Sequence, residues 1–224
     1  MKKLLLIMAI TIAFSFVLIS CTADAEDTAQ PTTQAEQSEQ NNEPFRPGAS
    51  FTWSREESIE DLAARARRYI VRVEVLDERT ELFNSSAGLV SFEEINTIHR
   101  LRVLEVFQGN TQPGEVIEVR QMGGELNGET FVNDDLVSLA AGEELVMFLF
   151  GVTQEEYPDL DWSAGSRPAT LINPWQGIYR VPPASLGGQD IAAQADDTVL
   201  ESLHPDNNLV LTVGDLARIA AASE

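Results

Sequence analysis

The sequence predicts a mainly β domain, built as a small barrel or a β-sandwich, with a short helix at its start and another at its end. Three observations support this prediction. Several segments between residues 69 and 181 alternate apolar with polar residues or are apolar throughout, as strands do. Gly- and Pro-containing pairs separate these segments and favour turns. Residues 51–224 are also numerous enough to bury one hydrophobic core as a single domain.

The first element expected in this domain is a short amphipathic helix over residues 55–67. Ser54 and Glu57 have the spacing of a capping box, in which the serine accepts from an amide in the first turn and the glutamate reaches back. Apolar residues follow at helical spacing from Ile59 to Ala66. This spacing predicts one buried face on the helix.

After this helix the apolar pattern changes to a period of two. Residues 69–75 alternate in the manner of a half-buried strand. Residues 98–107 form a longer strand, with Leu101 and Val103 on its core face. Glycine and proline turn signals then lead to a third strand over residues 115–121.

Two more strands and a helix complete the domain. Residues 145–150 are continuously apolar, which is typical of a strand covered on both faces. A fifth strand is expected around residues 177–181. Near the end of the chain, Thr212 and Asp215 can cap a final helix that carries apolar residues such as Leu216.

The first 20 residues differ in kind from the domain, because they have the pattern of a secretory signal. Lys2 and Lys3 supply a positive start, and residues 4–19 are apolar apart from Thr11 and Ser15. A membrane-spanning helix is the alternative, but it needs about 20 apolar residues. The run is shorter than that and is followed by polar, acidic residues without a basic cluster. Export is therefore favoured over spanning.

The run ends in Leu18-Ile19-Ser20-Cys21, which resembles the lipobox of bacterial lipoproteins. The resemblance implies that the Cys21 sulfur receives a diacylglycerol, that the chain is cut before Cys21, and that the new amino terminus is acylated with a fatty acid such as palmitate. Two or three acyl chains give a stable anchor, whereas one gives only marginal membrane binding. The alternative is a free or buried cysteine that happens to follow a signal peptide. The resemblance implies a lipid-anchored protein on the extracytoplasmic face of the cell membrane.

Residues 21–50 link this cysteine to the domain, and they predict a disordered acidic tether. Residues 22–50 contain no Val, Ile, Leu or Met, so they cannot bury enough apolar surface to offset the entropy of ordering. As a flexible coil they span on the order of 30 Å. The formal net charge of the chain is −21, which should repel nucleic acid and anionic headgroups. We therefore expect no nucleic-acid partner.

Parts of the domain are similar to netrin-like domains with an OB fold, the family that includes the tissue inhibitors of metalloproteinases. The similar segments are DLAARARRYIVRVEVLDE, HRLRVLEVFQGN and GEELVMFLFG. The resemblance covers about half of the domain and implies an OB-like barrel, with peptidase inhibition as a possible activity. The inhibitors of that family use an N-terminal cysteine and disulfides, whereas Cys21 is the only cysteine of this chain. No functional residue is therefore carried over.

The residues that could support catalysis or metal binding do not form a known pattern. No Gly-x-Ser-x-Gly elbow is present. Of the two histidines, His99 is expected at the end of a strand and His204 in an exposed turn. Asp159 and Asp161 start a calcium-loop pattern that lacks the required glycine and glutamate. We expect neither a metal nor a cofactor.

Paired carboxylates leave one enzymatic alternative open. Asp134-Asp135 and Glu143-Glu144 could be the acid and base of an envelope hydrolase, with Asp159 as a further carboxylate. With so many acidic residues in the chain, such pairs are also expected by chance. This alternative requires two carboxylates that face each other across a cleft.

Four aromatic residues, Tyr157, Trp162, Trp175 and Tyr179, are the candidate binding residues. They lie in or beside the irregular region 151–183, and aromatic side chains on loops often form partner surfaces. The competing interpretation is that they close one end of the barrel over its core. The favoured function is a non-enzymatic lipoprotein whose β domain binds a protein or glycan partner in the cell envelope. An envelope hydrolase and a peptidase inhibitor are the alternatives.

Overall fold

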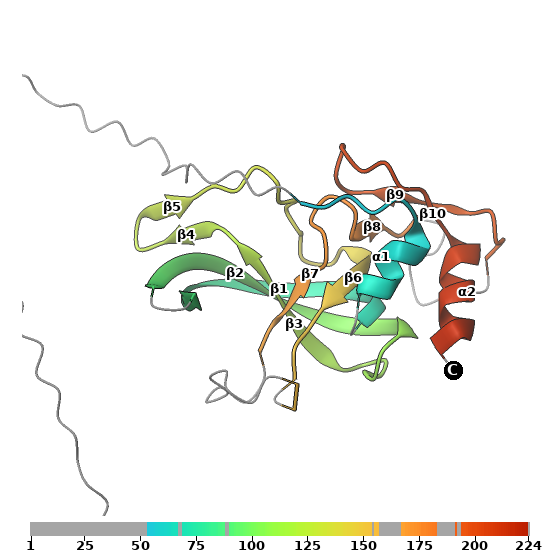
Figure 1. Cartoon of the computed structure of the whole chain (residues 1–224), viewed down its shortest axis with the longest axis horizontal. Helices are drawn as coiled ribbons and strands as arrows, with labels where there is room; N and C mark the ends of the chain where they lie inside the picture. Colours follow the sequence, from blue (N-terminus) through green and yellow to red (C-terminus); the bar gives the residue numbers. More distant parts are fainter. Residues whose placement is uncertain are drawn as a thin grey trace, which may run out of the picture. The chain divides into compact units, whose positions relative to one another are not determined.

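The structure is a computed structural model, and it describes residues 53–66, 69–87, 90–153, 155–156, 167–182, 191 and 194–223. The chain divides into two units, residues 1–41 and 42–224, and every described residue belongs to the second. That unit is mainly β, as the sequence predicts, with a short helix near its start and another at its end (Figure 1). None of the helices in the described part is long and apolar enough to cross a membrane.

Five strands close into a small barrel, so the barrel is the observed one of the two expected architectures. Neighbouring strands are antiparallel, except that β3 and β7 are parallel. Pairing of β6 with β1 closes the ring, as in other small barrels. In order around the ring they are β1 (Tyr69–Ala87), β2 (Val90–Gln108), β3 (Val116–Met122), β7 (Ala169–Leu171) and β6 (Glu144–Phe150).

Short strands extend the sheet beyond β6 and lead to the helical end of the unit. They are β8 (Ile178–Arg180), β9 (Val199–Ser202) and β10 (Leu211–Thr212). The helices α1 (Ile59–Arg65) and α2 (Val213–Ser223) contact each other, and α1 also contacts β6. Figure 1 shows both helices at one end of the domain.

A separate hairpin of β4 (Gly124–Leu126) and β5 (Glu129–Phe131) lies at the other end (Figure 1). Asn127 and Gly128 both have positive φ, 54° and 85°, as a tight hairpin turn of type I′ requires. A Cβ at Gly124 would lie only 2.7 Å from Thr97 Oγ1. Glycine is therefore required where the hairpin leaves the barrel.

Two apolar clusters occupy the two faces of the barrel sheet. Inward-facing residues of the barrel strands form the first, which includes Val71, Val73, Leu101, Val103, Val119 and Met147. The second lies between the outer face of the barrel and the helices, and it includes Leu62, Ile70, Phe148, Tyr179, Leu211 and Leu216. Alternate residues of one strand enter different clusters because successive side chains point to opposite faces.

Strand β6 belongs to both clusters, which confirms the expectation of a strand covered on both faces. Leu145 and Met147 lie in the inner cluster, whereas Val146 and Phe148 lie in the outer one. All four side chains are fully buried. The continuous apolar run is thus the consequence of a core on each side of the strand.

The start of β1 differs from the half-buried strand expected over residues 69–75. Ile70 and Arg72 on its outer face are as inaccessible as the valines on its inner face. The Arg72 guanidinium forms ion pairs with Glu144 and Glu105 of neighbouring strands, and its Nε donates to Glu144 Oε2 at 3.1 Å. The sequence pattern predicted a solvent-facing side chain at Arg72. Ion pairs with the two glutamates instead allow its charge to be buried beneath the outer apolar cluster.

The expected first helix begins later than the sequence pattern suggested. Helix α1 starts at Ile59 with Ser58 as its N-cap, and Ser58 Oγ accepts from the Asp61 amide at 3.1 Å. The capping box at Ser54 and Glu57 is therefore wrong. Ser54 lies in the extended segment before the helix, where its carbonyl accepts from Asn173 Nδ2 at 2.9 Å.

The expected cap of the final helix is confirmed. Thr212 Oγ1 accepts from the Asp215 amide at 3.2 Å, and Asp215 Oδ2 accepts from the Thr212 amide at 2.7 Å. This reciprocal pair is a capping box. Leu216 and Ile219 are buried on the inner face of α2.

The expected strands are present, but the first two are much longer than their apolar patterns. Strands β1 and β2 have 19 residues each and form one long antiparallel pair. Register shifts between Ile70 and Val71, Arg72 and Val73, and Val75 and Asp77 interrupt the pairing, and such bulges bend strands. Alternation therefore does not continue along the whole strand.

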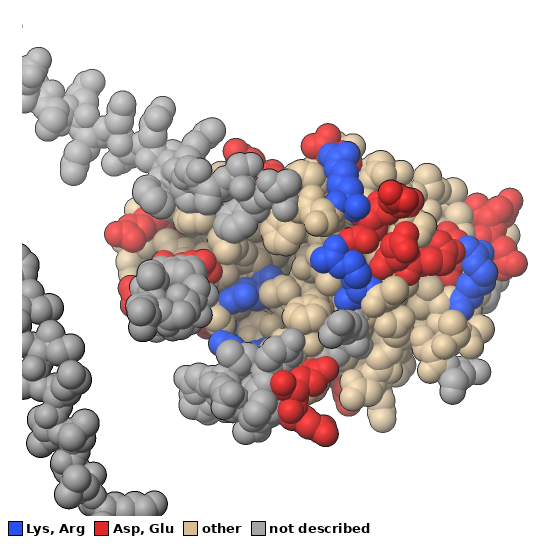
Figure 2. Space-filling model, viewed as in Figure 1, with Lys and Arg blue, Asp and Glu red and all other residues tan. Residues whose placement is uncertain are grey.

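The surface of the described residues carries both signs of charge. Figure 2 shows acidic side chains spread over the visible face with basic ones among them, and no continuous basic patch on the described part of that face. Many of these charges form pairs across strands, such as Arg100 with Asp77 and Arg102 with Glu74. These exposed pairs contribute little stability individually.

Candidate functional site

A cavity of about 290 Å³ lies where β3 and β7 separate. These two strands pair over only two positions, Val119 with Ala169 and Arg120 with Thr170. The residues at and beyond the last pair line the cavity from both sides. They are Arg120 to Met122 on β3, and Thr170 to Ile172 at the end of β7. The brevity of the parallel pair therefore creates the opening.

The cavity has a largely apolar wall. Met122, Leu136, Phe150, Leu171 and Ile172 contribute to it, together with Trp53 and Pro174. Such a wall favours the burial of an apolar body. The polar residues around the same cavity are fewer and include Asn96, Arg120 and Gln121.

Arg120 supplies a positive charge to the cavity. Its guanidinium lies 4.2 Å from the centroid of the Phe83 ring, and that of Arg167 lies 5.5 Å from the same centroid. Burial lowers the pKa of Arg120; the charge of Glu94 opposes this effect and that of Arg167 adds to it. Arginine stays protonated despite such a shift, so a cation is held at the cavity.

Among the described residues, no hydrogen-bond acceptor or carboxylate lies within hydrogen-bond or ion-pair distance of the Arg120 guanidinium, although the charge of Glu94 acts on it from further away. Other arginines of the barrel do have carboxylate partners: Arg79 pairs with Glu118, and Arg100 with Asp77. The chain has 36 acidic and 15 basic residues, yet the Arg120 guanidinium has no carboxylate within ion-pair distance in the described part. Its donors are available to an anion.

Asn96 supplies an unsatisfied acceptor to the same cavity. Its side chain is 1% exposed, and its Nδ2 donates to the Glu94 carbonyl at 3.1 Å. Its Oδ1 is buried without a hydrogen-bond partner. An unpaired buried acceptor costs about 1–3 kcal/mol, so a donor from a ligand would be stabilising there.

Gln121 connects the cavity to a buried histidine. His99 Nε2 lies 2.9 Å from Gln121 Oε1, and Gln121 Nε2 donates to the Val137 carbonyl at 3.4 Å. The amide orientation requires that His99 donate from Nε2. Burial lowers the pKa of His99, and the contacts with Gln121 and Glu78 oppose that effect. His99 is thus a neutral interior residue in the middle of β2 and not at the strand end that was expected.

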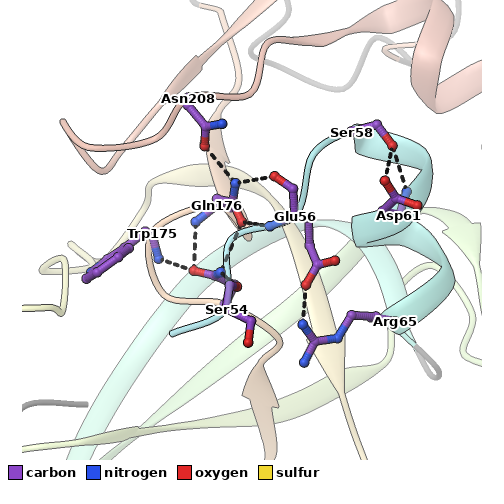
Figure 3. Close-up of polar contacts among 9 residues, drawn as sticks. Ser54, Glu56, Ser58, Asp61, Arg65, Trp175, Gln176 and Asn208 are labelled. Carbon is purple, nitrogen blue, oxygen red and sulfur yellow. Dashed lines mark hydrogen bonds and ion pairs between the residues drawn. The ribbon is translucent and has the colours of Figure 1, made fainter. Parts of the chain in front are cut away.

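A buried amide network holds the segment that precedes α1 next to the cavity. Gln176 is fully buried, and its side chain accepts from the Glu56 amide at 2.8 Å and donates to the Glu56 carbonyl at 3.0 Å. The Asn173 side chain donates to the Ser54 carbonyl, and Gln176 also donates to Asn208 Oδ1 at 2.8 Å. Figure 3 shows these contacts converging from three parts of the chain. The network fixes the position of Trp53, which lines the cavity.

The candidate binding residue Trp175 lies beside this network. The Arg55 guanidinium lies 5.0 Å from its ring centroid, the His204 ring 5.9 Å away, and its Nε1 donates to Asp135 Oδ1 at 3.3 Å. The side chain is half-buried. His204 is only 8% exposed, so the expectation of an exposed histidine is wrong, because Trp175 packs against its ring.

The other candidate binding residues do not join Trp175 at a described surface. Tyr179 is fully buried in the outer cluster, where it packs edge-on against Phe148 at 6.1 Å, and burial raises its pKa to about 12. It cannot contact a partner from that position. Tyr157, Trp162 and Cys21 lie outside the described residues.

Three of the four paired carboxylates considered for a hydrolase have other partners, and the fourth, Asp134, is exposed. Glu143 pairs with Arg180, Glu144 pairs with Arg72, and Asp135 accepts from Trp175. No group of three or more metal-ligating side chains forms among the described residues. Asp159 and Asp161 lie outside those residues.

Sequence reasoning missed the two polar residues that distinguish the cavity, Arg120 and Asn96. A signal was present for Asn96, because asparagine is depleted in strands and this one stands in a strand-like segment. Arg120 gave no such signal, because it alternates with apolar residues as a solvent-facing residue would. In comparisons with known proteins, no family model matches this chain, and no curated protein or solved structure matches it either.

Proposed function

We propose that this protein is a lipoprotein anchored to the extracytoplasmic face of the cell membrane, whose β domain binds a ligand and does not catalyse a reaction. The observation that carries the anchoring is Cys21, the only cysteine, placed after Leu18-Ile19-Ser20 at the end of the apolar run. A single thiol at that position is explained by S-alkylation with a lipid. The predicted tether over residues 22–50 then gives the domain its distance from the membrane.

The binding role is supported by the cavity between β3 and β7. It combines an apolar wall with a cation and an acceptor that lack partners among the described residues. Pockets of this composition bind small ligands or the ends of larger ones. In OB-like barrels the second and third strands form a common binding face, and Asn96 and Arg120 stand on the corresponding strands β2 and β3. A protein or glycan of the envelope remains the expected source of the ligand.

Mass spectrometry of the protein purified from its own membranes tests the anchoring. We expect a chain that begins at Cys21, carries a diacylglyceryl group on sulfur and an acyl group on nitrogen, and incorporates labelled palmitate. The matched control is Cys21→Ala, which removes the nucleophile and should leave the leader attached and the label absent. A wild-type chain with a free thiol at Cys21, or with the leader still attached, would refute the proposal.

A further inference from the structure

The cavity beside β3 offers three features that one ligand can satisfy together. The first is the Arg120 guanidinium, which has no hydrogen-bond or ion-pair partner among the described residues and is held over the Phe83 ring. A planar guanidinium binds a carboxylate through two parallel hydrogen bonds. Arg120 is the cation that lines the cavity in the described part of the chain, so one negative charge on the ligand matches it.

The second feature is the free acceptor of Asn96. Because its Nδ2 is engaged by the Glu94 carbonyl, the side-chain orientation leaves Oδ1 as the unpaired atom. A ligand N–H group satisfies this atom, and a ligand oxygen does not. The ligand therefore carries a donor as well as an anion.

The third feature is the apolar wall and its size. Met122, Leu136 and Phe150 form part of it, and the cavity volume is about 290 Å³. This volume is at the small end of the range for ligand pockets, about 300–1,000 Å³. A cavity of this volume accommodates one apolar side chain but is too small for a long acyl chain.

We infer that the cavity binds the α-carboxylate end of an apolar amino-acid residue, either a free amino acid or the C-terminus of a short peptide. The carboxylate pairs with Arg120, the α-nitrogen donates to Asn96 Oδ1, and the side chain packs on the apolar wall. A fatty acid lacks the donor, and a phosphate dianion lacks a second cavity-lining cation among the described residues. This inference rests on the binding function proposed above.

Calorimetric titration of the mature lipoprotein in mild detergent tests the inference. The probes are free leucine, N-acetyl-leucine and the peptide acetyl-Gly-Gly-Leu, which separate a free amino acid from a peptide end. The controls are N-acetyl-leucinamide, which lacks the carboxylate, 4-methylpentanoate, which lacks the donor, and N-acetyl-serine, which lacks the apolar side chain. We expect at least one acid probe to bind, and its amide analogue to bind at least about tenfold more weakly.

Substitutions assign this binding to the cavity. Arg120→Gln should weaken the binding of the acid probe by about 10- to 100-fold, because the substitution removes a charge-assisted contact with the carboxylate. The matched control is Arg100→Gln on β2, an exposed arginine paired with Asp77, which should leave the affinity within about twofold. If Arg120→Gln does not fold, Arg120→Lys keeps the charge but lacks the fork, and it should still weaken binding.

Three results would overturn the inference: no acid probe binds, the amide binds as well as the acid, or Arg120→Gln and Arg120→Lys both retain the wild-type affinity. None of these results affects the acylation of Cys21, which is measured separately. A protein that is acylated but does not bind the probes is still an anchored lipoprotein with a different ligand. A protein that binds the probes but is not acylated refutes the anchor alone.

Discussion

At the scale of single residues, Arg72 shows how a charge becomes part of a buried layer. Its side chain is 3% exposed, and it pairs with Glu144 on β6 and Glu105 on β2. Glu105 in turn accepts from the Ile191 amide at 3.1 Å. The three strands β1, β2 and β6 are thus joined by charges on the same outer face that the helices cover.

Glu144→Gln should destabilise the protein strongly, because it removes the carboxylate charge that pairs most closely with the buried Arg72 guanidinium; the Glu105 contact is longer, at 3.8 Å. We expect a loss of about 3 kcal/mol in the free energy of unfolding, measured by urea denaturation. Glu201→Gln removes an exposed partner of Arg180 and should change it by less than about 0.5 kcal/mol. The double variant Arg72→Met, Glu144→Leu should recover much of the loss. Equal effects of the two single substitutions would contradict this account of the buried pair.

His99 gives a pH-dependent contribution to stability. Burial lowers its pKa below the ordinary value of 6.5 in the folded protein. As the pH falls below about 6.5, the unfolded chain therefore binds a proton before the folded protein does. Stability due to His99 is complete above this pH and is lost below it. In His99→Asn, the decrease of the urea midpoint between about pH 6.5 and 5 should be smaller than in the wild type. An unchanged pH dependence would mean that the contacts with Gln121 and Glu78 cancel the effect of burial on the pKa of His99.

At the scale of elements, the cap of α1 can be tested directly, because the sequence pattern placed it at Ser54 and the structure places it at Ser58. Ser58→Ala removes the side chain that accepts from the Asp61 amide and should cost about 1 kcal/mol. Ser54→Ala should have almost no effect, because Ser54 is exposed and contacts Asn173, in the described part of the chain, through its backbone carbonyl. Thermal unfolding of both variants provides the comparison. A larger loss of stability in Ser54→Ala than in Ser58→Ala would mean that the helix begins after Ser54, as the sequence pattern predicted.

The sequence predicted elements well where a pattern was long and uninterrupted. The apolar run of β6 and the capping box of α2 both lie where they were expected. The start of α1 was misplaced because Ser54 has a glutamate three residues later, whereas contacts with Asn173 and Gln176 hold the backbone around Ser54 outside the helix. Strand β7 has three residues and β10 has two, and segments of that length carry no period to recognise.

The candidate site was less predictable than the fold, since its residues meet only through strand pairing. Asn96 and Met122 are paired on β2 and β3, whereas Phe83 comes from β1 and Leu171 from β7. None of these residues is near another in the sequence. Aromatic residues were the visible signal instead, and Tyr179 shows that an aromatic residue near a loop can belong to the core.

At the scale of the whole molecule, the excess of negative charge is the dominant feature. The formal net charge is −21, and self-repulsion at such a charge destabilises the compact state. The thermal unfolding midpoint should therefore rise between 0.05 and about 1 M NaCl, as salt screens the repulsion. Sucrose at equal osmolality separates screening from general solute exclusion. A midpoint that falls with NaCl would show that the surface ion pairs contribute more than the repulsion.

If the chain is anchored at Cys21 as we propose, the amide network at Gln176 has a mechanical consequence. A force applied through the residues before Trp53 reaches the folded domain at Ser54 and Glu56, where Asn173 and Gln176 hold the backbone. Trp53 directly precedes this clamp and is also part of the cavity wall. Tension on such a chain would therefore pass through the wall of the pocket before it reaches the barrel.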